Sequence, residues 1–231
     1  MSAPRLPKSE MYWKNKGIKP LPIWKNSEVQ YTYKNVMIYT HDDLDGICSA
    51  FITKQWLLRQ GFNILGYGVI NYQESFRYTT LDKDVINVCV DYSKNHDNIH
   101  CYIDHHIGEV SKDVYAIKTA TGSAYEGIRL QFGLPTDELT VKYIDMIDSF
   151  RYIECDVDLK DLINFDYKRI FESKNPKLTF AGMVNQFIKR SDHNTLIEVA
   201  HNMKSTSVYE IYHCFKKFYP ANNKNKDFLE D

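Results

Sequence analysis

The sequence predicts an α/β fold, a doubly wound and mostly parallel sheet with an N-terminal arm and a C-terminal helical region. Three short apolar runs, over residues 36–39, 85–90 and 99–103, have the composition of buried strands. An acidic residue follows each run closely, and helical patterns alternate with the strand-like segments. Such alternation is typical of a parallel sheet, and ligands of open α/β sheets bind at the carboxyl ends of the strands.

The first run ends in one histidine and three carboxylates, within the stretch 39–50 that reads YTHDDLDGICSA. His41, Asp43 and Asp45 alternate, so on an extended stretch their side chains would point to the same side. Carboxylates this close repel one another unless a cation or protons neutralise them, and carboxylate with imidazole suits Mn, Mg or Zn. Alternatively, Asp45 is only the N-cap of a helix that begins near Gly46. Both interpretations are open on this stretch alone.

The other two runs add more residues of the same kind. The second run closes on Asp91, and the third closes on Asp104, His105 and His106. Acidic residues are common in turns, which explains any one of these strand ends. The occurrence of three such ends in one sequence is poorly explained in this way. The three ends together indicate a divalent metal site at one edge of the sheet.

In this order, His-x-Asp-x-Asp-Gly, a strand ending in Asp, and Asp-His-His resemble the motifs of the DHH phosphoesterases, over roughly residues 34–150. That family includes RecJ-type exonucleases, nanoRNases, pAp phosphatases, cyclic-dinucleotide phosphodiesterases and manganese-dependent inorganic pyrophosphatases. The resemblance implies a hydrolase, a metal-dependent phosphodiesterase or phosphatase that cleaves a phosphoester in a nucleotide or short oligonucleotide.

The resemblance also implies two divalent ions at the sheet edge, with Mn²⁺ expected and Mg²⁺ as the alternative. The expected ligands are His41, Asp43 and Asp91 for the first ion, and Asp45, Asp91, His105 and Asp148 for the second. Asp91 would bridge the two ions. Asp145, three residues before Asp148 on nearly the same helical face, is the fallback for the last ligand.

The remaining site residues follow from the same resemblance. His106 stays outside the metal set and would contact a phosphate oxygen, while Asp104 would orient a histidine. The helix start at Thr121 and Ser123 offers backbone amides to a substrate anion. Capping by either hydroxyl explains these two residues at least as well.

The other elements follow from apolar spacing and stop residues. Apolar residues at helical spacing predict a helix over 47–59 that Gly61 would end, and residues 64–70 predict a strand. Residues 71–81 have the polar and aromatic composition of a connector. Further along, we expect an edge strand over 114–117 and helices over 121–133 and 139–152.

The chain divides into three predicted regions. Residues 1–33 hold four of the seven prolines among lysines and tryptophans, and form an extended arm on the surface that could also contact single-stranded nucleic acid. Residues 34–152 form the DHH domain. Residues 153–231 form a helical cap or packing region, with the clearest patches at 180–188 and 208–218.

Composition limits the functional classes. The formal net charge of -1 gives no indication of a nucleic-acid partner. Five scattered cysteines without a Cys-x-x-Cys pair fit a reducing cytoplasm. No apolar segment approaches membrane-spanning length, so we expect no membrane partner. The sequence carries no indication of oligomeric state.

Three alternatives remain at this point. A RecJ-like single-strand exonuclease is favoured by the arm but disfavoured by the charge. A non-hydrolysing nucleotide-binding DHH protein is disfavoured by the intact metal set. An inorganic pyrophosphatase needs a cationic second domain, and only one of the ten glycines, Gly182, follows position 134, so no glycine-rich phosphate loop can be identified there.

Overall fold

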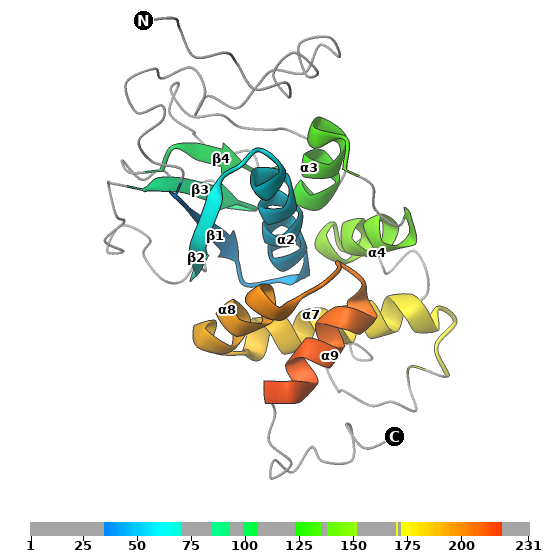
Figure 1. The fold of residues 1–231 in the computed structure, drawn as a ribbon. Coiled ribbons are helices and arrows are strands. Elements are labelled where there is room, and N and C mark those ends of the chain that lie inside the picture. The colour runs from blue at the N-terminus through cyan, green and yellow to red at the C-terminus, as the bar shows by residue number, and fades with distance from the viewer. Residues whose placement is uncertain are drawn as a thin grey trace, which may run out of the picture.

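The computed structural model describes residues 35–70, 85–92, 99–105, 123–134, 138–151, 170 and 172–218. These residues form one four-stranded sheet and six helices (Figure 1). The expected arm over 1–33, the connector over 71–81 and the edge strand over 114–117 lie outside the described residues.

The sheet consists of β1 (Asn35–His41), β2 (Asn63–Ile70), β3 (Ile86–Val90) and β4 (Cys101–Ile103), in the order β2-β1-β3-β4. All neighbouring strands are parallel, which confirms the predicted α/β fold. The chain runs from β1 to β2 on one side and returns to β3 on the other side, so the strand order reverses beside β1. In open α/β sheets, ligands bind at the carboxyl ends of the strands beside such a reversal.

Alternation along β1 places its side chains in two separate apolar cores. Val36 and Ile38 are fully buried in the larger core with the helices, whereas Tyr39 belongs to a smaller cluster on the opposite face. All five residues of β3 are buried, as expected for a strand inside a parallel sheet. The end of β3 is therefore held firmly beside the end of β1.

Helix α2 (Leu44–Arg59) begins three residues earlier than the sequence predicts. Asp43 is its N-cap, with extended backbone, and the Asp43 side chain accepts a hydrogen bond of 2.9 Å from the amide of Gly46. The N-cap interpretation of Asp45 is therefore wrong, because Asp45 lies within the first helical turn. Gly61 ends the helix as predicted, with a left-handed φ of 82° that favours glycine.

Helices α3 (Ala124–Phe132) and α4 (Glu138–Asp148) follow along the chain. Trp56 of α2 stacks on Phe132 of α3 with ring centroids 4.0 Å apart, which joins the two helices through the core. Helix α4 ends four residues before the predicted position 152, because Phe150 turns into the left-handed region with a φ of 58°.

The C-terminal region contributes α7 (Pro176–Arg190), α8 (His193–Asn202) and α9 (Val208–Phe218). The expected patches over 180–188 and 208–218 lie in α7 and α9. Helix α8 was not predicted; its signal is Asp192, whose carboxylate accepts a 3.0 Å hydrogen bond from the amide of Thr195.

The three C-terminal helices share the larger core with the sheet. Each of them buries apolar side chains there beside β1 and α2, including Leu178, Leu196 and Ile211. They pack below α2 and α4 in Figure 1. The proposed boundary at residue 153 stays a prediction.

Among the described helices, none combines the length and the apolar character needed to cross a membrane. The four cysteines that the structure describes are free and buried.

Candidate metal centre

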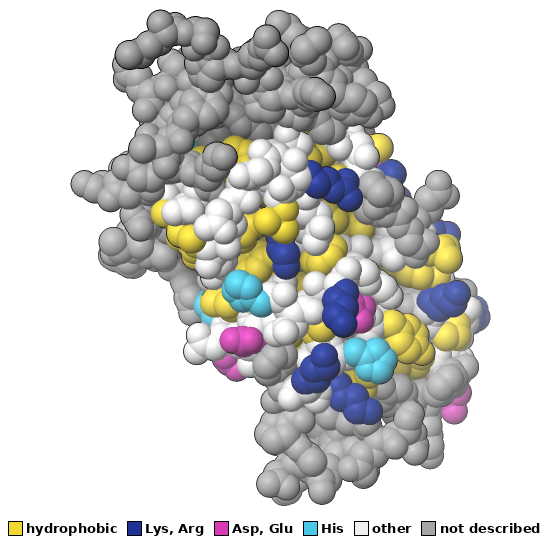
Figure 2. Space-filling model, viewed as in Figure 1, with side chains coloured by type: hydrophobic (Ala, Val, Ile, Leu, Met, Phe, Trp, Pro, Cys, Tyr) yellow, Lys and Arg dark blue, Asp and Glu magenta, His cyan; other side chains and the backbone are white. Residues whose placement is uncertain are grey.

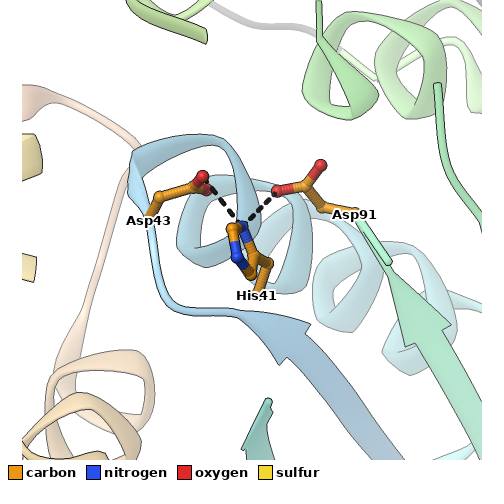
Figure 3. Close-up of side chains that lie close together, drawn as sticks. All are labelled: His41, Asp43 and Asp91. Carbon is orange, nitrogen blue, oxygen red and sulfur yellow. Dashed lines mark hydrogen bonds and ion pairs between the residues drawn. The ribbon is translucent and has the colours of Figure 1, made fainter. Parts of the chain in front are cut away.

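The carboxyl ends of β1 and β3 bring three predicted ligands together (Figure 3). His41 is the last residue of β1, Asp43 caps α2, and Asp91 follows β3. His41 Nδ1 lies 2.9 Å from Asp43 Oδ2 and 3.8 Å from Asp91 Oδ2. An imidazole between two carboxylates is a donor set that suits a divalent metal.

A second group forms around His105, which follows β4. The Nε2 atom of His105 lies 3.2 Å from Asp148 Oδ2, at the end of α4, and 3.7 Å from Asp45 Oδ2, in the first turn of α2. With the first group included, residues in or next to five elements therefore meet at this edge of the sheet: β1, α2, β3, β4 and α4.

Asp91 lies between the two groups. Its Oδ2 atom is 3.8 Å from His41 Nδ1, and its Oδ1 atom is 3.4 Å from His105 Nε2, so each carboxylate oxygen faces a different histidine. The residue is fully buried, and its amide donates a 2.8 Å hydrogen bond to the carbonyl of Ile103. Its φ of 56° is uncommon for a residue other than glycine, and such backbone conformations concentrate at functional sites.

Burial and mutual repulsion raise the pKa of three of these carboxyl groups above the ordinary range of an aspartate. Burial, followed by the charge of Asp43, raises the pKa of Asp45 to about 7. Burial, followed by Asp45 and Asp43, raises the pKa of Asp148 to about 9. The pKa of Asp91 is raised well above its usual range by burial and by the neighbouring aspartates. A divalent cation would relieve both effects, since its positive charge would offset the clustered carboxylates.

His41 and Asp43 behave as an ion pair instead. Burial acts to lower the pKa of His41, but the hydrogen bond and the charge of Asp43 outweigh it, so the pKa of His41 is raised. Burial acts to raise the pKa of Asp43, yet the bond to His41 lowers the pKa overall. Metal binding at this position would therefore replace the proton of His41.

Among the described residues, three groups could hold a metal ion, with all ligand atoms of a group within 4.8 Å of one another. They are His41 with Asp43 and Asp91, Asp45 with His105 and Asp148, and Asp91 with Asp104 and His105. The expected ligands thus lie together, and the roles assigned to them stay predictions.

Four further residues were predicted to belong to the site without binding a metal, and the structure describes two of them. Asp104 is buried, and its Oδ1 accepts a 2.8 Å hydrogen bond from the backbone amide of His105, so it contacts the backbone of that histidine. Ser123 caps α3, where its hydroxyl accepts a 3.3 Å hydrogen bond from the amide of Glu126. His106 and Thr121 lie outside the described residues.

The first amides of α3 bind an anion, but that anion is a side chain of the site itself. The amide of Ala124 donates to Asp45 Oδ2 at 2.7 Å, and the amide of Tyr125 donates to Asp45 Oδ1 at 2.8 Å. The positive end of the helix dipole thus stabilises and orients Asp45. The substrate-binding roles of Thr121 and Ser123 stay predictions.

The two aspartates of α4 face different partners. Asp148 lies at His105, as described above, whereas the side chain of Asp145 accepts a hydrogen bond from the Ser123 hydroxyl. Burial raises the pKa of Asp145 to about 6. This arrangement favours Asp148 as the ligand and gives Asp145 a part in joining α3 to α4.

Two residues of α7 reach the site, and the sequence interpretation missed both. Asn185 Oδ1 accepts a 2.9 Å hydrogen bond from the amide of Leu44, and Lys189 Nζ lies 3.8 Å from Asp43 Oδ2. Neither belongs to a motif, and no local spacing links them to residues 43 and 44. Asp42, which has no assigned role, places its Oδ1 atom 3.2 Å from His41 Nε2.

No protein-family model and no curated protein matches this chain. Among solved structures, exonuclease RecJ bound to manganese aligns with 11% identity and a TM-score of 0.47, over 90% of this chain and 68% of that chain. RecJ from Thermus thermophilus, in complex with Mn²⁺, aligns with 12% identity and a TM-score of 0.35, over 91% and 42%. CDC45 from Entamoeba histolytica aligns with 14% identity and a TM-score of 0.36, over 68% and 35%.

These neighbours include RecJ, the type of exonuclease that the motif resemblance names. The TM-scores of these three structures are below 0.5, so conclusions about function depend on the residues of the site.

Proposed function

We propose that this chain is a DHH-type phosphoesterase that hydrolyses a nucleotide or short oligonucleotide with two divalent cations, most suitably Mn²⁺. The observation that carries the proposal is the position of Asp91. A fully buried carboxylate, with one oxygen toward His41 and the other toward His105, is suited to join two metal positions. Burial without a cation would leave its negative charge poorly compensated.

In this proposal, His41, Asp43 and Asp91 hold one ion, and Asp45, Asp91, His105 and Asp148 hold the other. Two ions so placed would supply an activated water and neutralise charge that develops on phosphoryl oxygens. The chain's own residues orient this set. The α3 amides fix Asp45, and Asp104 holds the backbone of His105 through its amide.

In this proposal, residues other than the metal ligands bind the substrate. We assign His106 to a phosphate oxygen, as a donor outside the metal set. Ser123 and Thr121 lie at or before the start of α3 in the sequence and are the further candidates. A compact substrate fits the near-neutral charge of -1 better than a long polyanion does. We retain the cytoplasm as the compartment, from the scattered cysteines.

Metal removal tests the proposal directly. The full chain is treated with EDTA, dialysed, and assayed on pAp, a dinucleotide, a cyclic dinucleotide, single-stranded DNA and pyrophosphate. Hydrolysis of at least one phosphoester should be abolished and then restored by Mn²⁺, with about two ions bound per chain by metal analysis. Full activity in excess EDTA after exhaustive dialysis would overturn the two-metal proposal. Metal binding without hydrolysis of any substrate would favour the nucleotide-binding alternative.

A further inference from the structure

One face of α7 lies against residues 41–45, which join β1 to α2 and are called the ligand loop below. Asn185 and Lys189 are four residues apart, so they occupy the same side of the helix one turn from each other. Asn185 bonds to the amide of Leu44, and Lys189 approaches the carboxylate of the preceding residue, Asp43. The hydrogen bond of Asn185 joins α7 to the ligand loop, and Lys189 lies one helical turn further along, at the edge of the site.

Lys189 is accessible from solvent and lies beside the first metal group, that of His41, Asp43 and Asp91. Its side chain is 42% exposed, whereas that of Asp43 is 8% exposed. Lys189 therefore lies between solvent and a buried carboxylate of the first metal group.

Asp43 does not need this lysine as its partner. Its carboxylate already accepts hydrogen bonds from His41 Nδ1 at 2.9 Å and from the Gly46 amide at 2.9 Å. A half-exposed lysine at 3.8 Å adds little stability to such a group, because ion pairs open to solvent contribute little to stability. Stability alone gives a weak reason for the position of Lys189.

The position of a lysine beside two cations becomes favourable when an anion lies between the lysine and the cations. Two divalent ions and an ammonium group repel one another, and a phosphate group that contacts all three removes that repulsion. The flexible stem of lysine and its three donors suit contact with a phosphate oxygen.

We propose that Lys189 binds a phosphate oxygen of the substrate and that Asn185 positions it, so that α7 forms the substrate side of the site. This inference depends on the proposed function and adds to it a binding residue from the C-terminal region. The ligand class is a phosphate monoester or diester, and inorganic phosphate is its simplest probe.

The experiment compares Lys189→Met, Lys189→Arg and Lys177→Met in the full chain. Lys177 is an exposed lysine in the first turn of the same helix, twelve residues away, which is roughly 18 Å along the axis. Each protein is loaded with Mn²⁺, its metal content is measured, and its affinity for inorganic phosphate is determined by calorimetry. KM and kcat are then measured on the best phosphoester of the panel.

We expect Lys189→Met to keep the wild-type metal content while binding phosphate about tenfold or more weakly, with KM raised to a similar degree. Lys189→Arg should recover most of the phosphate affinity, and Lys177→Met should behave as the wild type. Unchanged phosphate affinity in Lys189→Met, with the metals bound, would overturn this inference and leave the phosphoesterase proposal intact. A wild type that binds neither Mn²⁺ nor phosphate would overturn both.

Discussion

At the scale of single residues, Asp91 combines the proposed bridging role with a cost in stability. The residue combines full burial, four neighbouring aspartates that raise its pKa, and a left-handed backbone. Burial and the neighbouring carboxylates are unfavourable for an ionised aspartate without a cation. The left-handed backbone adds a steric cost that does not depend on charge. The residue is therefore explained better by the proposed metal site than by the fold.

Asp91→Asn should lower metal occupancy at both positions and reduce turnover more than about 100-fold, since even the partners of metal ligands contribute about 10–100-fold. Asparagine keeps the size of the side chain, has no charge to bury, and tolerates the left-handed backbone. We therefore expect the metal-free variant to melt at the same temperature as the metal-free wild type or higher. Calorimetry and metal analysis check both effects. Two ions retained at wild-type stoichiometry would contradict the bridging role.

The pair Asp148 and Asp145 gives a second comparison at this scale. Asp148→Asn should lose one ion and most activity, because Asp148 Oδ2 lies 3.2 Å from His105 Nε2 within the second group. Asp145→Asn is the matched control on the same helix, since its amide oxygen can still accept the hydrogen bond from Ser123. Metal content of the two purified variants decides the assignment. The reverse pattern would make Asp145 the ligand.

At the scale of elements, the site depends on how α2 and α3 begin. Because α2 starts at Leu44, its cap and its first turn each supply a carboxylate to a different metal group. The start of α3 then fixes Asp45 by two backbone hydrogen bonds. Two helix starts thereby hold the acidic motif against the end of β1.

Gly46→Ala tests this close packing. A Cβ at Gly46 would overlap the carbonyl oxygen of His41 and lie 2.9 Å from Thr40 Oγ1, so the ligand loop or α2 must shift. We expect a loss of about 1–3 kcal/mol in the free energy of unfolding and weaker Mn²⁺ binding. Gly66→Ala is the control, because its Cβ would lie 3.5 Å from Met37 Sδ, an ordinary contact. Denaturant unfolding and Mn²⁺ titration of both variants measure the effects; equal, small changes would show that the loop adapts freely.

At the scale of the whole molecule, α7 joins the candidate site to the core that all three C-terminal helices share. Helix α7 packs its apolar side into that core and presents Asn185 and Lys189 to the ligand loop. On the face seen in Figure 2, Lys and Arg side chains gather over the part where Figure 1 draws α9, which carries Lys216 and Lys217 in its last turn. A positively charged face suits binding to the phosphates of a longer nucleic acid, as the RecJ-like alternative requires.

Substrate length distinguishes the two functions. We expect faster turnover on a dinucleotide than on long single-stranded DNA, at low and at moderate salt, because the formal charge is only -1. The measurement is repeated on a chain that lacks residues 1–33, the predicted basic and aromatic arm. Faster cleavage of the long strand that is lost with the arm, or that falls steeply with salt, would support a single-strand nuclease instead.

The sequence by itself determined the elements that local patterns encode. Apolar runs and their acidic ends located the strands β1, β3 and β4, and helical spacing with Gly61 located most of α2. The motif residues were identifiable for the same reason, since each group lies within a few positions of a strand end. Parallel strands bring their carboxyl ends to one edge, so placing the strands also placed the motifs near one another.

Only the tertiary structure decided which groups meet across the chain. The contact between Leu44 and Asn185 joins residues 141 positions apart, and no periodicity within a helix or strand encodes such a pair. The tertiary structure likewise decided that the α3 amides bind Asp45 and that Asp148, rather than Asp145, faces His105. These choices depend on how α3, α4 and α7 pack on one core, and that packing is set by the shape and burial of side chains from the whole chain.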